Sequence, residues 1–327
     1  MKLLHTGNRP QANVKDLILE YSIVILCLLL LFVPATFSST YLNAASLTAL
    51  SKDIAIWGTM AIGVSFVMLT GNNDLSIGLS VSMLTVFTVL LANRFGAVIA
   101  IPAVLVIGIL AGALNGLLVG VLGLNPYIAT LGTQLLFEGI GLVVSGGSPI
   151  YNYNASIAAF YDMVILDLGI LKLTLPFLVS MLLLAAASWF LKYTNFGQNI
   201  YVVGGNREAA ALCGISTRKV TIVCYAISGF CAAVTAIFVT SLNSCGNGAV
   251  GLRFSLQTVA ACVLGGISMS GGYGSAARAI LGVCAMQLIQ KTLYQIDASL
   301  ANLQVGIIGI VLLVFMLINN ATQSNAK

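Results

Sequence analysis

The chain has 327 residues, of which 59% are hydrophobic and only 7% are charged, and its mean hydropathy is +1.04. An average soluble domain carries roughly a quarter charged residues, so this composition excludes an ordinary soluble protein. The apolar residues form continuous runs, whereas a β-barrel alternates apolar and polar residues. The sequence therefore predicts an all-α integral membrane protein, and its net charge of +5 is attributed to cytoplasmic loops rather than to nucleic-acid binding.

About ten membrane-spanning segments are expected within one transmembrane domain that comprises residues 1–327. A polar, basic tail at residues 1–16 precedes the first segment and is expected to be cytoplasmic. The segments are predicted near residues 17–37, 54–70, 79–93, 97–122, 127–145, 173–191, 220–242, 256–269, 279–294 and 303–318.

Between the second and third segments lies the sequence GNNDLSIG, residues 71–78, which contains two amides and a carboxylate in a row. Polar side chains at membrane depth are costly and by default suggest function. Asn72, Asn73, Asp74 and Ser76 are therefore candidates for a translocation pathway or gate. The alternative is that Asp74 caps the third segment by accepting backbone N–H groups. Both roles stay open at this point.

The fourth and fifth segments also carry polar side chains. Asn115 has small neighbours that allow close helix contact, so it is either a link between helices or a contact for a transported solute. Gln134 and Glu138 are four residues apart and share one helix face, which could be directed to the bundle interior. Glu138 is either a structural carboxylate or part of a proton relay.

The loop at residues 192–219 contains four basic residues against one acid. Lysine and arginine are enriched in cytoplasmic loops, so this loop is expected inside, together with both termini. Its alanine-rich sequence NREAAALCG favours a short helix that ends at Gly214.

A second glycine-rich stretch, GGISMSGGYGS, occupies residues 265–275. Glycine permits tight turns and close backbone contact, and interrupted helices often line transport pathways. We therefore predict that residues 71–78 and 265–275 are broken or re-entrant segments at the cytoplasmic ends of spans. Gly265, Gly266 and Ser270 join the pathway candidates.

No set of residues suggests catalysis or a metal site. His5 is the only histidine, and the nucleotide-binding pattern GxxxxGK[ST] is absent. We expect a non-catalytic chain that binds no cofactor of its own.

Three stretches together resemble the permease subunits of bacterial ABC importers for monosaccharides, the ribose, arabinose, xylose and galactose permease family. The first stretch carries Gly71, Asp74, Leu75, Ser76 and Gly78. The second carries Glu208, Ala209, Ala210 and Gly214. The third carries Gly265, Gly266, Gly271, Gly272, Gly274 and Ser275.

The resemblance implies an inner-membrane permease that works with a second permease chain, a cytoplasmic ATPase that holds ATP and Mg²⁺, and a periplasmic sugar-binding protein. It also implies that a coupling helix contacts the ATPase through Arg207, Glu208, Ala209, Ala210 and Gly214.

Two departures from the family pattern affect the predicted cargo. Asn72 and Asn73 stand where the family usually has glycine and isoleucine, and Glu138 stands where arginine is frequent. The cargo is therefore either a monosaccharide or another small polar solute, such as a modified sugar, a sugar-like signal molecule or a nucleoside. The alternative function is a secondary transporter driven by protons through Glu138 or Asp74.

Overall fold

The computed structural model describes residues 14–38, 40–167, 169, 172–297, 303, 306, 307, 309 and 310. Most of the predicted tail at residues 1–16 and of the predicted segment at residues 303–318 therefore lies outside the described residues.

Helices dominate the described part of the chain, as predicted, and short strands connect a few of them. The helices are α1 (Val14–Phe32), η1 (Pro34–Thr36), α2 (Ala44–Leu69), α3 (Ile77–Phe95), α4 (Ala97–Gly120), α5 (Pro126–Ser145), α6 (Ala155–Phe160), α7 (Leu175–Tyr193), α8 (Asn195–Gly205), α9 (Arg207–Leu212), α10 (Thr217–Asn243), α11 (Phe254–Leu264) and α12 (Ala276–Ile296). The strands are β1 (Ile150–Tyr151), β2 (Val164–Asp167), β3 (Lys172–Thr174) and β4 (Cys245–Gly246).

Six of the described helices are long and apolar enough to cross a membrane: α2, α3, α4, α5, α7 and α10. The predicted number of ten spans is not confirmed. At 11 residues, α11 is only about 16 Å long, because an α-helix rises 1.5 Å per residue. The helix α12 is longer but carries several polar side chains.

The helices α2 and α5 begin directly after asparagine residues whose side chains cap them. The Asn43 carboxamide oxygen accepts the Ser46 backbone N–H at 2.8 Å, so α2 begins at Ala44 and not near residue 54 as predicted. The Asn125 oxygen accepts the Tyr127 N–H at 3.0 Å, and Pro126 occupies the first turn of α5. Asparagine at the N-cap and proline just inside the helix are favoured because both suit the unpaired N–H groups there.

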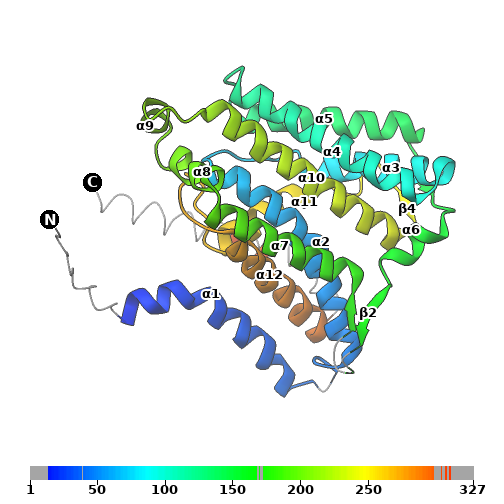
Figure 1. The fold of residues 1–327 in the computed structure, drawn as a ribbon. Helices are drawn as coiled ribbons and strands as arrows, with labels where there is room; N and C mark the ends of the chain where they lie inside the picture. The colour runs from blue at the N-terminus through cyan, green and yellow to red at the C-terminus, as the bar shows by residue number, and fades with distance from the viewer. Residues whose placement is uncertain are drawn as a thin grey trace.

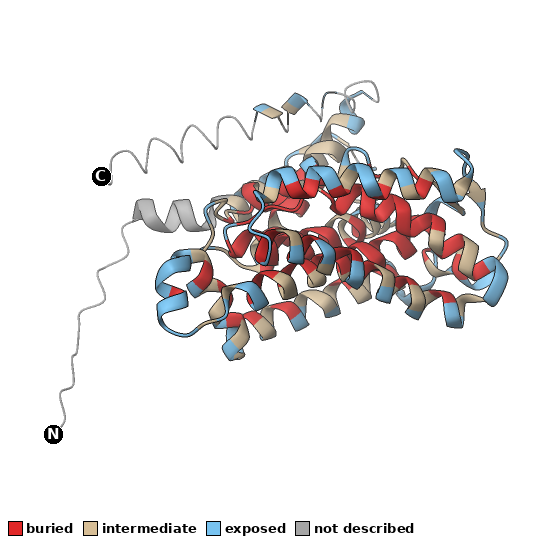
Figure 2. Ribbon diagram, turned by 90° about the horizontal axis from the view of Figure 1, so that it is seen from above, coloured by how far each residue is buried: buried red, intermediate tan, exposed pale blue. Residues whose placement is uncertain are grey.

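The helices form a bundle (Figure 1), and Figure 2 shows the buried residues concentrated within it. The interior consists mainly of α2, α3 and α10. Of the most apolar 18-residue stretch in each helix, 78% is buried in α2 and 72% in α3 and α10, against 28% in α4 and α5. The less buried helices lie at the periphery and present apolar outer faces.

The longest contact in the bundle joins α4 to α10. Four glycines of α4, spaced four residues apart, lie along this contact: Gly108, Gly112, Gly116 and Gly120. A Cβ atom at Gly112 would lie only 2.1 Å from the Tyr225 carbonyl oxygen. The two backbones are therefore in direct contact, as is common where small residues line membrane helices.

The bundle has two distinct ends (Figure 1). We call the end with α8 and α9 the α9 end, and the opposite end, with the four strands and α6, the strand end. Strand β1 pairs with β4, and β2 pairs with β3, both antiparallel.

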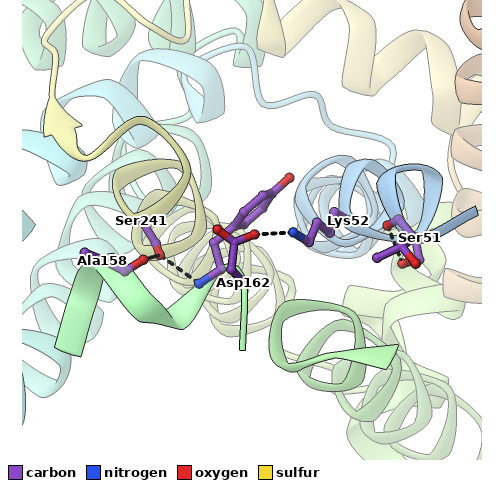
Figure 3. Close-up of polar contacts among 7 residues, drawn as sticks. Ser51, Lys52, Ala158, Asp162 and Ser241 are labelled. Atoms are coloured by element: carbon purple, nitrogen blue, oxygen red, sulfur yellow. Dashed lines mark hydrogen bonds and ion pairs between the residues drawn. The ribbon is translucent and has the colours of Figure 1, made fainter. Parts of the chain in front are cut away.

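Side-chain bonds link the elements of the strand end (Figure 3). Lys52 on α2 forms an ion pair with Asp162, which follows α6. The Ser241 hydroxyl of α10 accepts the Tyr161 N–H at 2.8 Å and donates to the Ala158 carbonyl at 3.2 Å. These bonds attach the α6 segment to α2 and α10.

Candidate functional site

The polar stretch between α2 and α3 is buried in the bundle. Asn72, Asn73 and Asp74 expose 4%, 2% and 2% of their surface. Asp74 bonds to Ser228, near the middle of α10, and Ser76 bonds to Asn115 of α4. The stretch therefore penetrates the bundle interior and does not form a surface loop.

The Asp74 carboxylate accepts three hydrogen bonds. The Ser76 N–H and hydroxyl donate to Oδ1 at 3.0 and 2.6 Å, and the Ser228 hydroxyl donates to Oδ2 at 2.7 Å. No described lysine or arginine forms an ion pair with it. Asp74 therefore satisfies the backbone N–H of Ser76, which is the N-cap residue of α3, so it supports this helix start without being its N-cap. Its role in a pathway stays a prediction.

A chain of hydrogen bonds extends from Asp74 to two further helices. The Asn115 Nδ2 donates to the Ser76 hydroxyl at 2.7 Å, and the Thr133 hydroxyl donates to Asn115 Oδ1 at 2.6 Å. Asn115 therefore joins the α2–α3 connection, α4 and α5, which is the structural role predicted for it. Contact with a solute stays a prediction.

The two asparagines differ in their contacts. Asn72 donates to the Thr70 hydroxyl at 2.8 Å. Asn73 donates through Nδ2 to Tyr127 Oη at 2.7 Å, and its backbone carbonyl accepts from Tyr225 Oη at 2.7 Å. The buried Asn73 Oδ1 has no partner in the described part of the chain, so the polar cluster retains one free acceptor.

The second glycine-rich stretch connects α11 to α12. A Cβ atom at Gly265 would lie 2.0 Å from the Arg278 carbonyl oxygen, so α11 and α12 touch there through their backbones. Gly266 has a φ of +86°, a left-handed conformation that disfavours side chains other than glycine. Ser270 is exposed.

The two glycine-rich stretches meet at the α9 end. The Gly272 N–H donates to the Leu69 carbonyl, the last residue of α2, at 3.0 Å. A Cβ atom at Gly271 would lie 2.5 Å from the Gly71 nitrogen, and one at Gly204 would lie 1.9 Å from the Leu69 oxygen. We call these contacting glycines, Gly71, Gly204, Gly271 and Gly272, the glycine junction.

Two short helices occupy the predicted cytoplasmic loop. Helix α9 begins after Asn206, whose Oδ1 accepts the Ala209 N–H at 2.9 Å. It ends before Gly214, which has a φ of +80° and donates its N–H to the Ala211 carbonyl at 3.0 Å. The predicted helix and its glycine end are therefore confirmed.

Most of α9 is exposed at the surface. Arg207, Glu208 and Ala209 are exposed, whereas Ala210 is buried and attaches the helix to the bundle. Leu212 is 90% exposed.

The loop is linked to the glycine-rich stretches through α8. Gly204, at the C-terminal end of α8, contacts both Leu69 and Gly272 through the backbone. The Tyr201 hydroxyl of α8 donates to the Gly274 carbonyl at 3.1 Å. A displacement of α8 would thus be transmitted to both stretches at once.

Gln134 and Glu138 lie apart from the Asp74 cluster. Both are half-buried on α5, and neither forms a hydrogen bond or an ion pair with a described residue. Neighbouring residues on this face, including Leu131 and Leu135, are exposed. The two polar residues share a face, as predicted, but they lie at the edge of the outer face of α5 and not inside the bundle.

Sequence reasoning missed several residues of the site. Ser228 and Tyr225 lie in an apolar run of α10, where nothing local marks them as partners of Asp74 or Asn73. Gly204 and Asn206 have a local signal, because GGN directly precedes the alanine-rich helix. Asparagine in that position is a typical N-cap.

Comparison with known proteins identifies a family of membrane transport proteins. Residues 46–316 match the family described as "Branched-chain amino acid transport system / permease component". No solved structure matches the chain significantly.

The similar proteins include several named autoinducer 2 import system permease protein LsrC. The protein from Salmonella choleraesuis (strain SC-B67) is 36% identical over 271 residues, which cover 82% of this chain and 77% of that protein. The protein from Escherichia coli O157:H7 is 32% identical over 295 residues, which cover 89% of this chain and 85% of that protein. The protein from Shigella flexneri is 33% identical over 300 residues, which cover 89% of this chain and 85% of that protein.

These matches and the six membrane-length helices define the class of protein, a membrane-embedded permease of a solute import system. The chain belongs to the family of transport-system permease components that matches residues 46–316. The resemblance inferred from the three sequence stretches is thereby confirmed.

Proposed function

We propose that the chain is the membrane-spanning subunit of an ATP-driven importer for a monosaccharide or a similar small polar solute. A periplasmic binding protein delivers the solute, and a separate ATPase binds ATP and Mg²⁺ at the α9 end. The chain itself performs no chemistry on the solute. It resides in a bacterial inner membrane as a single multi-pass domain with both termini in the cytoplasm.

The observation that carries this proposal is the connection from exposed α9 to the glycine junction. Helix α9 presents Arg207, Glu208 and Leu212 to a partner. Directly before it, Gly204 touches the end of α2 and the second glycine-rich stretch. Because these contacts are between backbones, no side chain can rotate to absorb a movement of α8. A movement of the ATPase would therefore shift both stretches together.

The buried polar cluster supports a role for these stretches in the pathway. Asp74, Asn73 and Asn115 place a carboxylate and two amides inside the bundle beside the glycine junction. Ionisable and amide groups within membrane proteins commonly mark the route of a polar solute. Shifts of the glycine junction would alternately shield and expose these groups.

The outer face of α5 is the proposed contact with a second permease chain. Gln134 and Glu138 lie at its edge without partners among the described residues. A carboxylate facing lipid is energetically unfavourable, so coverage of this face by protein would be stabilising. Gly132 and Gly139 have no atoms within 4 Å of an added Cβ and allow a second helix to approach closely.

The names of the relatives direct the choice of cargo. Several are called autoinducer 2 import permeases, so autoinducer 2 is the first solute to test for this chain. The departures at Asn72, Asn73 and Glu138 leave both an ordinary monosaccharide and a modified or sugar-like solute as candidate cargoes.

The test is uptake by the assembled importer carrying Glu208→Lys. Reversing an exposed charge on α9 should weaken ATPase binding and reduce uptake at least tenfold without altering the folded permease. The control is Asp167→Lys on β2, which makes the same change on an exposed acid at the strand end and should leave uptake unchanged.

Two outcomes would contradict the proposal. Normal uptake with Glu208→Lys would remove α9 from the coupling site. Uptake by the chain alone that collapses with a protonophore and ignores ATP would establish the alternative, a secondary transporter driven by protons through Glu138 or Asp74.

A further inference from the structure

A cavity of about 450 Å³ lies between the first turns of α2 and the last turns of α12, at the strand end. Small-molecule sites typically have volumes of about 300–1,000 Å³. None of the residues that line this cavity belongs to the Asp74 cluster or to the glycine junction.

The α12 side of the cavity is a polar face on a helix of membrane-spanning length. Gln287, Gln290, Lys291 and Tyr294 all line the cavity. Their spacing of three, four and seven residues places them on one side of the helix. These four polar side chains give the α12 wall of the cavity donors and acceptors for a polar molecule.

Two of these residues have side-chain polar groups without a hydrogen-bond partner. Gln287 is 6% exposed, and its amide forms no hydrogen bond with any described residue. The buried Nζ atom of Lys291 likewise has no hydrogen-bond acceptor among the described residues. It lies 4.4 Å from the centre of the Tyr41 ring. A buried donor without an acceptor costs about 1–3 kcal/mol, and a ligand with hydroxyl or carbonyl oxygens would remove that penalty.

The charges around the cavity select the class of ligand. Asp53 lines the α2 side, opposite the lysine. A simple anion would be repelled by Asp53, and a simple cation by Lys291. A neutral molecule with several hydroxyl groups can accept from the lysine and donate to the carboxylate, because a hydroxyl does both. The exposed ring of Tyr294 offers an apolar surface for the ligand's C–H face.

We propose that this cavity binds a small neutral polyhydroxylated solute, such as a sugar, at the entrance of the permease. The site lies at the end opposite α9, where a solute would arrive if α9 faces the ATPase. Its role in import rests on the proposed function, whereas binding of the solute to the cavity can be tested by itself.

The test measures protection of an engineered cysteine in the full chain, reconstituted in lipid nanodiscs. Gln290→Cys places a thiol in the cavity, and its modification by a water-soluble maleimide is followed by mass spectrometry. The probes are D-ribose, L-arabinose, D-xylose and D-galactose, with gluconate as anion and glucosamine as cation. The unsubstituted chain gives the background from the seven native cysteines, and Leu166→Cys on β2 is the control outside the cavity.

We expect at least one neutral sugar to slow modification of Gln290→Cys at least threefold without affecting Leu166→Cys. Adding Gln287→Leu, which keeps the side-chain volume but removes the unpartnered amide, should raise the sugar concentration needed about tenfold. Absence of protection by all four sugars would overturn the proposal. Equal protection by gluconate or glucosamine, or protection unchanged by Gln287→Leu, would also overturn it.

Failure of this site and failure of the proposed function are distinguishable. If no sugar protects the thiol but Glu208→Lys still abolishes uptake, the cavity is not the entry site and the importer assignment holds. If a sugar protects the thiol and uptake does not depend on an ATPase, the site holds and the importer assignment fails.

Discussion

The two ends of the bundle are held together by different kinds of contact. At the strand end, the α6 segment is joined to α2 and α10 by side chains, through the Lys52–Asp162 ion pair and the Ser241 hydroxyl. At the α9 end, α2, α8 and the second glycine-rich stretch touch through backbone atoms at the glycine junction. Long side chains can adjust to small movements, whereas backbone contacts transmit them. Backbone contact at the glycine junction would therefore convey a movement of α8 to α2, whereas the side-chain links of the α6 segment can absorb small movements.

The largest effect is expected from Gly204→Ala. The added Cβ atom would lie 1.9 Å from the Leu69 oxygen and 2.5 Å from the Gly272 nitrogen, and only backbone shifts can relieve this. Overpacking typically destabilises by about 1–3 kcal/mol, and a clash with backbone atoms that cannot rotate away should lie at the upper end of that range. Uptake should be lost, and thermal unfolding of the purified chain should occur at a clearly lower temperature.

The neighbouring glycine supplies a matched control for this substitution. An added Cβ atom at Gly205 would have no atom within 4 Å, so Gly205→Ala should leave stability and uptake nearly unchanged. Similar behaviour of the two variants would show that the glycine junction does not transmit movement.

An intermediate effect is expected in the polar cluster between the two ends. Asn115→Leu removes the bridge between Ser76 and Thr133 and should destabilise the chain by about 2 kcal/mol. Thr133→Val removes one donor and should cost about 1 kcal/mol. Because the residues share one hydrogen bond, the double variant should lose less than the sum of the two. If denaturation of the purified variants shows that the stability losses of the two single variants add up to that of the double variant, the hydrogen-bond network through Asn115 is contradicted.

The smallest effect is expected at the strand end. Lys52→Met removes the ion pair with Asp162 but keeps most of the side-chain length. The Asp162 side chain is 78% exposed, so solvent screens the pair, and screened ion pairs contribute about 1 kcal/mol or less. Stability should therefore change little, and uptake should remain normal. Loss of uptake in a well-folded Lys52→Met permease would mean that the strand end also takes part in transmitting movement.

The features that the sequence predicts correctly depend on local signals. Helix α9 follows from its alanine-rich composition and from Gly214, and the start of α5 follows from Asn125 and Pro126. The burial of Asp74 follows from the apolar runs on both sides. Its partner Ser228 could not be predicted, because the two residues are 154 positions apart and meet only through packing of α10.

Two other features of the fold have local sequence signals that the sequence analysis did not use. The first turns of α2 contain serine, lysine and aspartate and resemble a loop, although Asn43 is a suitable cap. The polar face of α12 follows a regular helical spacing from Gln287 to Tyr294, but these residues were included in the predicted span at residues 279–294 and the polar face was not noted. The contact between the two glycine-rich stretches has no local signal, since glycine leaves no side chain to mark its partner.

The central claim is that α9 binds an ATPase, and a photo-crosslinking residue in place of Leu212 tests it most directly. This side chain is 90% exposed and lies beside Arg207 and Glu208. After irradiation of native membranes and mild solubilisation, mass spectrometry identifies the crosslinked protein. We predict that the crosslinked protein carries the GxxxxGK[ST] pattern. The crosslink should disappear when the permease also carries Glu208→Lys. Crosslinks to lipid alone, with no ATPase in comparable amount, would contradict the account.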